Sequence, residues 1–554
     1  MKKFFLRFLI FVFLIALGFA TGYYYPFSKK GDFTTKDMAK AAQIMDLQFE
    51  MPELDSAFQS LIDQQENYQG LRDLKIPNGV WPALLFNPIP TGKQFSTEQS
   101  EIKFSNYSGT KLPEDLNELA FYSIGQLAEL LKTQQITSEK LTSFFIDRLK
   151  KYDPQLHCVI TLTEELAIKQ AKRADSEIQA GMYKGFLHGI PYGIKDLLNT
   201  KTYKTTYGAT AYKDQLIDED AAVVQMLEKK GAVLIAKLTL GALAMDDVWF
   251  GEKTRNPWNT EIGSSGSSAG PASAVSASLV PFAIGSETWG SITSPANRCG
   301  VTGLRPTYGR ISRTGAMALS WSMDKLGPIT RYVEDCAIVF DAIYGPDNID
   351  PTIYDLPFNY QSEIDFSKLK IGYIQSSFEN DSAMKPFNFA GLKVLEDLGA
   401  ELVPFELPKM NVYDMAFLLS AEAAAAFDEL TLSNRDDLLK MQTQNSWPNI
   451  FRSARFIPAV EYIQANRARQ LLIQQMEEKM QAFDLFITPT FGKQLLLTNL
   501  TGHPCVVLPN GFIEENKPVS ISFIGQLFDE ATILAVAKAY QDATEHHLKH
   551  PVLE

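Results

Sequence analysis

A stretch rich in glycine and serine, from Gly263 to Pro295, reads GSSGSSAGPASAVSASLVPFAIGSETWGSITSP. It opens with six glycines and serines, continues through a segment of small residues, and closes on a second Gly/Ser turn. Glycine lets a backbone approach a ligand closely, because it has no Cβ and tolerates positive φ angles. A flexible linker is the alternative, but the apolar, patterned segment 272–284 favours a packed structure. The stretch therefore predicts one site to which two hydroxyl-bearing turns contribute.

Helical and strand patterns alternate before this stretch, from Phe121 onward. A short apolar strand after Gly189 is expected to end at Lys195, and two helices are expected to begin with Ser/Thr caps near Ser123 and Ser138. Alternation of helices with apolar strands predicts an α/β fold with a mixed central sheet. The other segments expected in this region are helices at 164–180 and 221–230 and a buried strand at 232–236.

The first 25 residues have the layout of an export signal. Two lysines and Arg7 precede an apolar run from Phe8 to Phe19, which ends in the small residues around Ala20. A secretory signal peptide is one interpretation, and an uncleaved membrane anchor through residues 4–20 is the other, although spanning a bilayer takes about 20 apolar residues. Either interpretation predicts an exported protein that lies in the periplasm or elsewhere outside the cytoplasm.

The region 31–115 is expected to be a helical N-terminal extension. Thr34 or Thr35 is the candidate N-cap of its first helix, and four prolines between 77 and 90 interrupt the helical pattern. The remaining residues, 116–554, are expected to form the main domain.

Composition excludes several classes of function. The formal charge is −13 and no sustained basic run occurs, so nucleic-acid binding through phosphate contacts is not expected. The cysteines are widely spaced and form neither a zinc motif nor a disulfide framework; lone buried thiols are expected, and a single bridge stays open. The tail 545–550 lacks the HExxH spacing and is interpreted as a solvated helix end. The four cysteines are Cys158, Cys299, Cys336 and Cys505.

Three side chains are candidates for catalysis: Lys195, Ser267 and Ser291. A lysine in a dry pocket loses its proton more easily, because burial disfavours its charged form, and it can then act as a general base. Taken alone, an exposed Lys195 paired with Asp196 is the more ordinary interpretation.

Ser291 ends a Gly turn whose backbone N–H groups can converge on one point. Thr288, Trp289, Gly290 and Ser291 together are the candidate oxyanion hole, although an ordinary Gly/Ser turn is the simpler interpretation of the turn alone. A rival is the GxSxG nucleophile elbow at 266–270, with Ser268 as nucleophile. The polar residues that precede this motif do not form the apolar strand that an elbow requires, and His503 is its only plausible triad partner.

From about Tyr122 to Tyr540 the chain resembles the amidase signature hydrolases, in particular the group that includes peptide amidases and the glutaminase subunit of the glutamyl-tRNA amidotransferase. The resemblance rests on separated motifs in the right order. The lysine motif is GIPYGIKD at 189–196, the family's GGSSGGS appears as SGSSAGP at 265–271, and the nucleophile motif is ETWGSIT at 287–293. Further landmarks are GLRPTYGR at 303–310, DKLGP at 324–328, FDLFITPT at 483–490 and NLTGHP at 499–504.

The resemblance implies an α/β fold with a mixed central sheet and helices on both of its faces. It also implies a catalytic triad of Lys195 as base, Ser267 as bridging serine after a cis peptide bond, and Ser291 as nucleophile. The expected activity is hydrolysis of a linear carboxamide through an acyl-enzyme, with a small-molecule amide as substrate and no metal or organic cofactor. Esters are also expected to react, because the same acyl-enzyme serves both.

The chain departs from the family pattern at three places near the nucleophile. Glu287 replaces the usual Asp, Trp289 replaces a small residue, and Thr293 replaces an Arg, whose loss argues against a substrate held by its carboxylate. Two alternative functions stay open. One is the glutaminase subunit of a tRNA-dependent amidotransferase, which would need partner subunits, and the other is a non-catalytic binding protein on the same scaffold. The sequence does not predict the oligomeric state.

Overall fold

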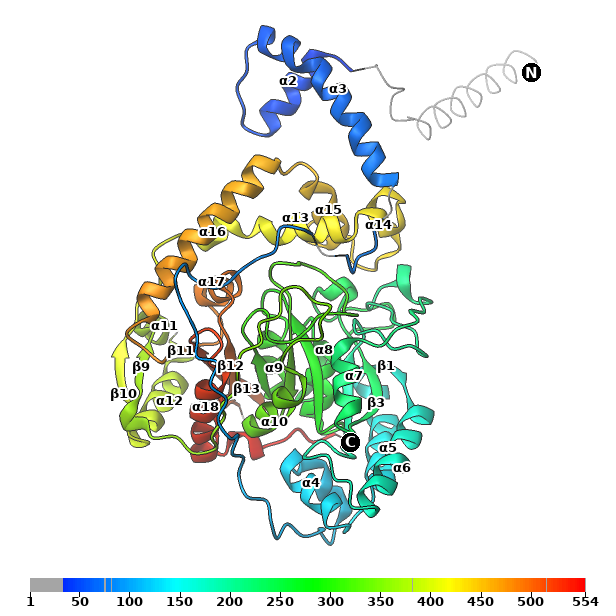
Figure 1. The fold of residues 1–554 in the computed structure, drawn as a ribbon, viewed down its shortest axis with the longest axis vertical. Helices are drawn as coiled ribbons and strands as arrows, with labels where there is room; N and C mark the ends of the chain where they lie inside the picture. Colours follow the sequence, from blue (N-terminus) through cyan, green and yellow to red (C-terminus); the bar gives the residue numbers. More distant parts are fainter. Residues whose placement is uncertain (1–32, 74–75, 81, 381, 515, 554) are drawn as a thin grey trace, which may run out of the picture. The chain divides into compact units, whose positions relative to one another are not determined.

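The computed structural model describes residues 33–73, 76–80, 82–380, 382–514 and 516–553 (Figure 1). The chain divides into two compact units, of which the first ends at Ile76 and the second begins at Pro77. This boundary falls inside the region 31–115 that the sequence assigns to the N-terminal extension. The predicted signal peptide or anchor, residues 1–25, lies outside the described residues.

The first unit is helical where it is described. It contains α2 (Thr35–Ile44) and α3 (Met51–Asp73), and the carboxylate of Asp37 accepts a hydrogen bond of 3.0 Å from the backbone N–H of Thr34. Thr34 is therefore the N-cap residue, one of the two candidates from the sequence. Neither these helices nor any other helix in the described residues is long and apolar enough to cross a membrane.

A mixed sheet forms the centre of the second unit. Among the described residues it has 11 strands in the order β1-β3-β2-β6-β8-β7-β12-β13-β11-β9-β10. Strand β2 runs parallel to β3 and β6, whereas β6 and β8 are antiparallel, so the predicted mixed sheet is confirmed. The strands are β1 (Val159–Leu162), β2 (Pro191–Lys195), β3 (Val233–Leu238), β6 (Phe282–Glu287), β7 (Thr302–Arg305), β8 (Lys325–Thr330), β9 (Lys370–Tyr373), β10 (Glu401–Pro404), β11 (Leu485–Pro489), β12 (Cys505–Ile513) and β13 (Lys517–Gly525). A separate two-stranded ribbon pairs β4 (Arg255–Asn256) with β5 (Asn259–Gly263).

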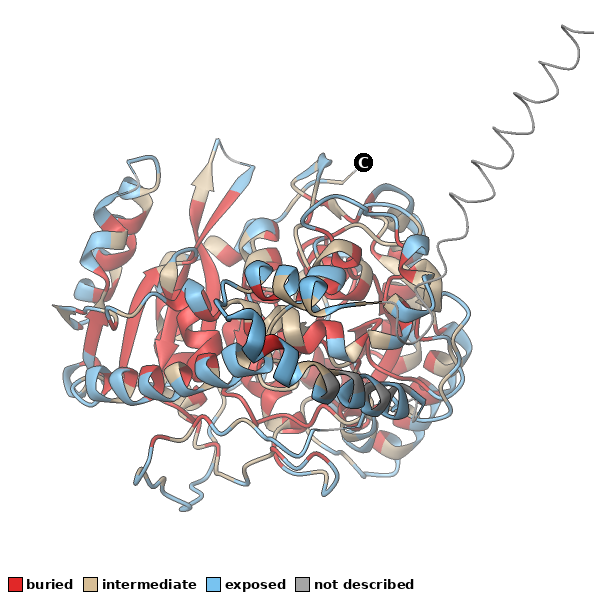
Figure 2. Ribbon diagram, turned by 90° about the horizontal axis from the view of Figure 1, so that it is seen from above, coloured by how far each residue is buried: buried red, intermediate tan, exposed pale blue. Residues whose placement is uncertain are grey.

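Helices flank the sheet, and the buried residues concentrate on the strands and on the helix faces that pack against them (Figures 1 and 2). The helices are α4 (Ile124–Lys132), α5 (Ser138–Leu156), α6 (Glu164–Gln179), α7 (Ala222–Lys229), α8 (Ala269–Ser276), α9 (Thr293–Cys299), α10 (Val333–Ile343), α11 (Gln375–Asn380), α12 (Lys385–Asp397), α13 (Phe417–Ala426), α14 (Asp428–Leu432), α15 (Trp447–Ala454), α16 (Ala459–Met480), α17 (Lys493–Thr501) and α18 (Glu530–Thr544).

Local sequence signals place several of these elements correctly. Ser123 caps α4 through a 3.2 Å hydrogen bond from the N–H of Gln126. The cap of α5 is Thr137 rather than Ser138, whose hydroxyl instead donates to the carbonyl of Gly189 at 2.8 Å. The stretch 269–287 forms the buried helix α8 and strand β6, which rules out the linker interpretation.

The four cysteines are free and buried, as the sequence predicts. The predicted solvated end of the chain is only partly right. His547 is buried and its ring packs edge-on against Tyr332, with the ring centroids 5.0 Å apart, because the tail returns to the main body after α18.

Candidate active site

The candidate site lies at one edge of the central sheet. Because β2 and β6 are parallel neighbours, their carboxyl ends meet at the same edge. Lys195 is the last residue of β2, and the turn 288–291 directly follows β6. Parallel strands commonly present functional groups at their carboxyl ends. Sheet topology thus brings together a lysine and a serine that are far apart in the sequence.

Lys195 is fully buried and is surrounded by serine hydroxyls. Its Nζ lies 2.7 Å from Ser267 Oγ, 2.8 Å from Ser286 Oγ and 3.2 Å from Ser268 Oγ. Burial lowers the pKa of Lys195 well below its usual value, and the negative charges of Asp324 and Glu287 oppose this shift only in part. This environment favours the neutral amine, which a general base requires.

The neighbouring acid does not pair with this lysine. Asp196 Oδ1 lies 2.9 Å from the Nζ of Lys237 on β3, and both side chains are fully buried. The interpretation of Lys195 as an exposed lysine paired with Asp196 is therefore wrong. Asp196 follows Lys195 directly, but successive side chains of an extended chain point to opposite sides.

The loop that carries Ser267 has the expected backbone. The Gly266–Ser267 peptide bond is cis. A Cβ at position 266 would lie 1.8 Å from the carbonyl oxygen of Asp246, so only glycine fits. This loop is tied to the turn 288–291, because the N–H of Ser268 donates to the carbonyl of Ser291 at 3.0 Å. The two Gly/Ser turns therefore contribute to one site.

The turn 288–291 has the properties of an anion-binding loop. Gly290 has φ +89°, a conformation that L side chains rarely adopt. Among the described contacts, none of the N–H groups from Thr288 to Ser291 donates to a protein acceptor. Ser291 is partly exposed, and Trp289 is 38% exposed. The turn thus keeps donors available beside an accessible hydroxyl.

Glu287 anchors the far end of this turn, a role that the sequence motifs did not reveal. Its Oε2 accepts hydrogen bonds from the N–H groups of Ile292 and Thr293, both 2.9 Å, and from the hydroxyl of Thr293 at 2.8 Å. Its Oε1 accepts from Arg305 and from Asn499, both 2.9 Å. The Thr293 hydroxyl therefore bonds to the same carboxylate, so two departures from the family pattern contact each other.

The charge of Glu287 is secured by these donors. Burial alone would raise the pKa of Glu287, but the adjacent Arg305 guanidinium and the hydrogen bonds lower the pKa to about 2. The motif ETWGSIT could have suggested an anchoring role for this acid, since it precedes the turn directly. Its basic partner could not be found from the sequence.

The elbow alternative finds no support in the geometry. Ser268 is fully buried, and its hydroxyl bonds to the backbone N–H and carbonyl of Ser286 at 3.1 and 3.0 Å. His503, its proposed partner, is bonded through Nδ1 to the hydroxyl of Thr501 at 2.8 Å. Burial lowers the pKa of His503 to about 3. Ser268 thus contributes to the surroundings of Lys195.

No metal centre is evident in the described ranges, where no group of three or more His, Cys, Asp or Glu side chains is placed to hold an ion.

Comparisons with known proteins show the family of this chain. The amidase family model matches residues 140–497. The A subunit of the glutamyl-tRNA(Gln) amidotransferase from Moorella thermoacetica is 34% identical over 487 residues, which cover 79% of this chain and 99% of that protein. The native peptide amidase of Stenotrophomonas maltophilia is 28% identical in sequence, with a TM-score of 0.70 over 78% of this chain and 98% of that one. This chain therefore belongs to the amidase signature family and is an amidohydrolase that acts on C–N bonds.

Proposed function

We propose that this protein hydrolyses a carboxamide through an acyl-enzyme on Ser291, with Ser267 and Lys195 as the proton relay. The observation that carries the proposal is the 2.7 Å contact between Lys195 Nζ and Ser267 Oγ inside a buried cluster of hydroxyls. Burial away from water favours the neutral form of a lysine, and a serine next to it can pass a proton onward.

The reaction runs in two halves. Ser291 Oγ attacks the carbonyl carbon of the amide while its proton passes to Ser267 and a proton of Ser267 passes to Lys195. The oxyanion that forms is held by the N–H groups from Thr288 to Ser291. The protonated relay then delivers a proton to the leaving nitrogen and the C–N bond breaks. Water adds to the acyl-enzyme by the reverse sequence and releases the acid.

A fluorophosphonate is expected to label Ser291 in the full-length protein. Peptide mass mapping locates the adduct. Labelling should disappear in Ser291→Ala and should slow at least 100-fold in Lys195→Ala and Ser267→Ala, because the relay activates the nucleophile. An adduct on Ser268 would instead support the elbow. The absence of any adduct, together with no hydrolysis of a panel of amides, would favour a non-catalytic scaffold.

A second candidate function is the glutaminase subunit of a tRNA-dependent amidotransferase. It is favoured by the 34% identity with the amidotransferase chain from Moorella thermoacetica. Such a chain works with partners, so the purified protein would release little ammonia from glutamine unless those partners were added. An amidase that acts alone hydrolyses its amide without tRNA, ATP or other chains.

Trp289 is expected to shape the substrate pocket. It follows the first candidate oxyanion donor, and its ring lies 6.4 Å from the ring of Tyr413, centroid to centroid. Replacing it by glycine should raise kcat/KM for bulky acyl groups relative to small ones about 10-fold, because the indole ring no longer occupies space beside the turn 288–291. Competition between a small and a bulky amide measures this ratio, and an unchanged ratio would contradict the idea.

Export through residues 1–25 stays a prediction. Cell fractionation, with determination of the N-terminal residue of the mature protein, distinguishes a cleaved signal, a retained anchor and an unexported protein. We infer no partner beyond the amide substrate for the amidase that acts alone.

A further inference from the structure

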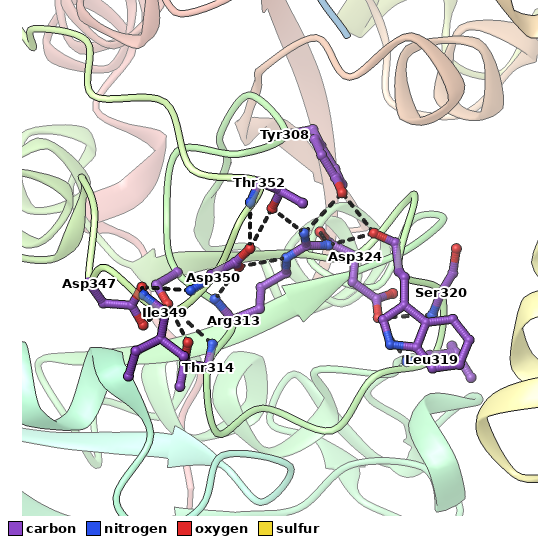
Figure 3. Close-up of polar contacts among 12 residues, drawn as sticks. Tyr308, Arg313, Thr314, Leu319, Ser320, Asp324, Asp347, Ile349, Asp350 and Thr352 are labelled. Atoms are coloured by element: carbon purple, nitrogen blue, oxygen red, sulfur yellow. Dashed lines mark hydrogen bonds and ion pairs between the residues drawn. The ribbon is translucent and has the colours of Figure 1, made fainter. Parts of the chain in front are cut away.

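Thr288, the first residue of the candidate oxyanion turn, is held by a carboxylate from another part of the chain. Its hydroxyl donates to Asp324 Oδ1 at 2.5 Å. The second oxygen of Asp324 accepts the backbone N–H groups of Leu319 and Ser320 at 2.8 and 2.9 Å, as Figure 3 shows. Hydrogen bonds to an ionised acceptor are shorter and stronger than neutral ones. The carboxylate therefore connects the turn to a fixed segment of backbone just before β8.

Arg313 hydrogen-bonds to the backbone at Asp324, and its positive charge favours the ionised form of the Asp324 carboxyl. Its Nη1 donates to the carbonyl oxygens of Trp321 and Asp324 at 3.0 and 2.9 Å, and its Nε lies 3.5 Å from Asp350 Oδ2 (Figure 3). The positive charge of the Arg313 guanidinium is thus paired with the carboxylate of Asp350. The carboxylate of Asp324 stays directed at Thr288 and the two N–H groups.

We propose that Asp324 is a positioning residue of the oxyanion site, which orients Thr288 and thereby aims the N–H groups of the turn 288–291. Glu287 anchors the turn after Ser291, through Ile292 and Thr293, and Asp324 anchors it before Trp289. The backbone N–H groups of the turn, which donate to no protein acceptor among the described contacts, lie between these two anchoring carboxylates. This inference rests on the proposed acyl-enzyme function, because an oxyanion site matters only if Ser291 attacks a carbonyl.

Asp324 also acts on the base through its charge. Its negative charge is the largest influence that counteracts the effect of burial on the pKa of Lys195. Removing this charge lowers the pKa of Lys195 further, so the acid limb of the pH profile moves to lower pH. Burial raises the pKa of Asp324 itself, and its hydrogen bonds and the charge of Arg313 oppose this shift only in part. The charged groups around this region are Lys195 on β2, Glu287 on β6, Lys325 on β8, Glu422 on α13, Arg469 on α16, and Arg305 and Arg313.

The test separates the hydrogen bond from the charge. Thr288→Val removes the hydroxyl and keeps the charge, Asp324→Asn removes the charge, and Thr288→Ser keeps both. We expect Thr288→Val and Asp324→Asn to lower kcat 10- to 100-fold with KM within threefold of wild type, and Thr288→Ser to stay within threefold in both. The acid limb of the kcat/KM profile should move to lower pH in Asp324→Asn and should keep the wild-type position in Thr288→Val.

A structural control comes from the same network. Thr352→Val removes a 2.6 Å bond to Arg313 Nη2 without touching the turn, so its kcat should stay within threefold of wild type. An unchanged kcat in Thr288→Val, or an equal loss in Thr352→Val, would overturn the proposal. The rate of fluorophosphonate labelling of Ser291 is the second readout. If the wild type and Thr288→Val are labelled at the same rate, the positioning role is refuted and the proposed function is not. If the wild type is not labelled at all, both the positioning role and the proposed function are refuted.

Discussion

Replacing Lys195 by methionine is expected to lower kcat for amide hydrolysis by about 10³- to 10⁴-fold, the size of effect that a lost general base can have. Methionine is unbranched and of similar length, so it fills the buried site without a cavity. The hydroxyls of Ser267 and Ser286, 2.7 and 2.8 Å from Nζ, lose their partner. Steady-state kinetics of the purified variant, with its melting temperature as a check of folding, measures the effect.

The pH dependence gives this prediction a second readout. A lysine that acts as a general base must be neutral. The proposal therefore predicts that kcat/KM of the wild type rises as pH rises through the lowered pKa of Lys195 and decreases as pH falls below that pKa. The residual activity of Lys195→Met should lose this limb. Lys325→Met is a matched control, because Lys325, the first residue of β8, is also a buried lysine but donates to the carbonyl of Met323. Activity of Lys195→Met within tenfold of wild type would contradict the role of Lys195 as base.

Replacing Glu287 by glutamine is expected to impair both stability and catalysis. All the groups that contact this carboxylate are donors, including Arg305, the N–H of Ile292 and the side chain of Asn499. An amide turns one acceptor into a donor and leaves the buried Arg305 without a counter-charge. Breaking a buried ion pair in this way costs about 3–5 kcal/mol. The turn then loses one support, and kcat should fall about 100-fold.

Denaturant unfolding at several pH values measures the stability part. The folded-state pKa of Glu287, about 2, lies below its ordinary value of 4.5, so its contribution is fully present above about pH 5. This contribution to the free energy of unfolding, about 3 kcal/mol, is lost as pH falls toward 2. The difference between wild type and Glu287→Gln should therefore shrink between pH 5 and pH 3.

Glu530→Gln provides the matched control for catalysis. Glu530 is a fully buried acid on α18 that pairs with the Nε of Arg310 at 3.1 Å. Its loss should destabilise the protein by a similar amount and leave kcat nearly unchanged below the melting temperature. If both variants lowered kcat equally, Glu287 would have no specific effect on the turn. Glu287→Asp, which restores the family's usual acid, should lie between wild type and Glu287→Gln, because its carboxylate reaches one methylene less far.

Local sequence patterns determined several helices and strands and the order of the candidate site residues along the chain. The cap at Ser123 and the strand that ends at Lys195 follow from side-chain patterns within a few residues. The helices predicted at 164–180 and 221–230 agree with α6 and α7 to within one residue at each end. The two Gly/Ser turns are recognisable because their conformations need glycine. These features depend on neighbours in the chain, so a single sequence contains the information.

The tertiary structure alone decided how these groups are buried and paired. Asp196 pairs with Lys237 on the next strand rather than with the lysine before it, and that choice leaves Lys195 among hydroxyls. Asn499 reaches Glu287 across 212 positions of sequence. Desolvation and charge pairing, which set the pKa of each group, depend on atoms that come together only when the sheet forms. The sequence therefore named Lys195 as a candidate base, and the packing around β2 and β6 supplied the environment that this role requires.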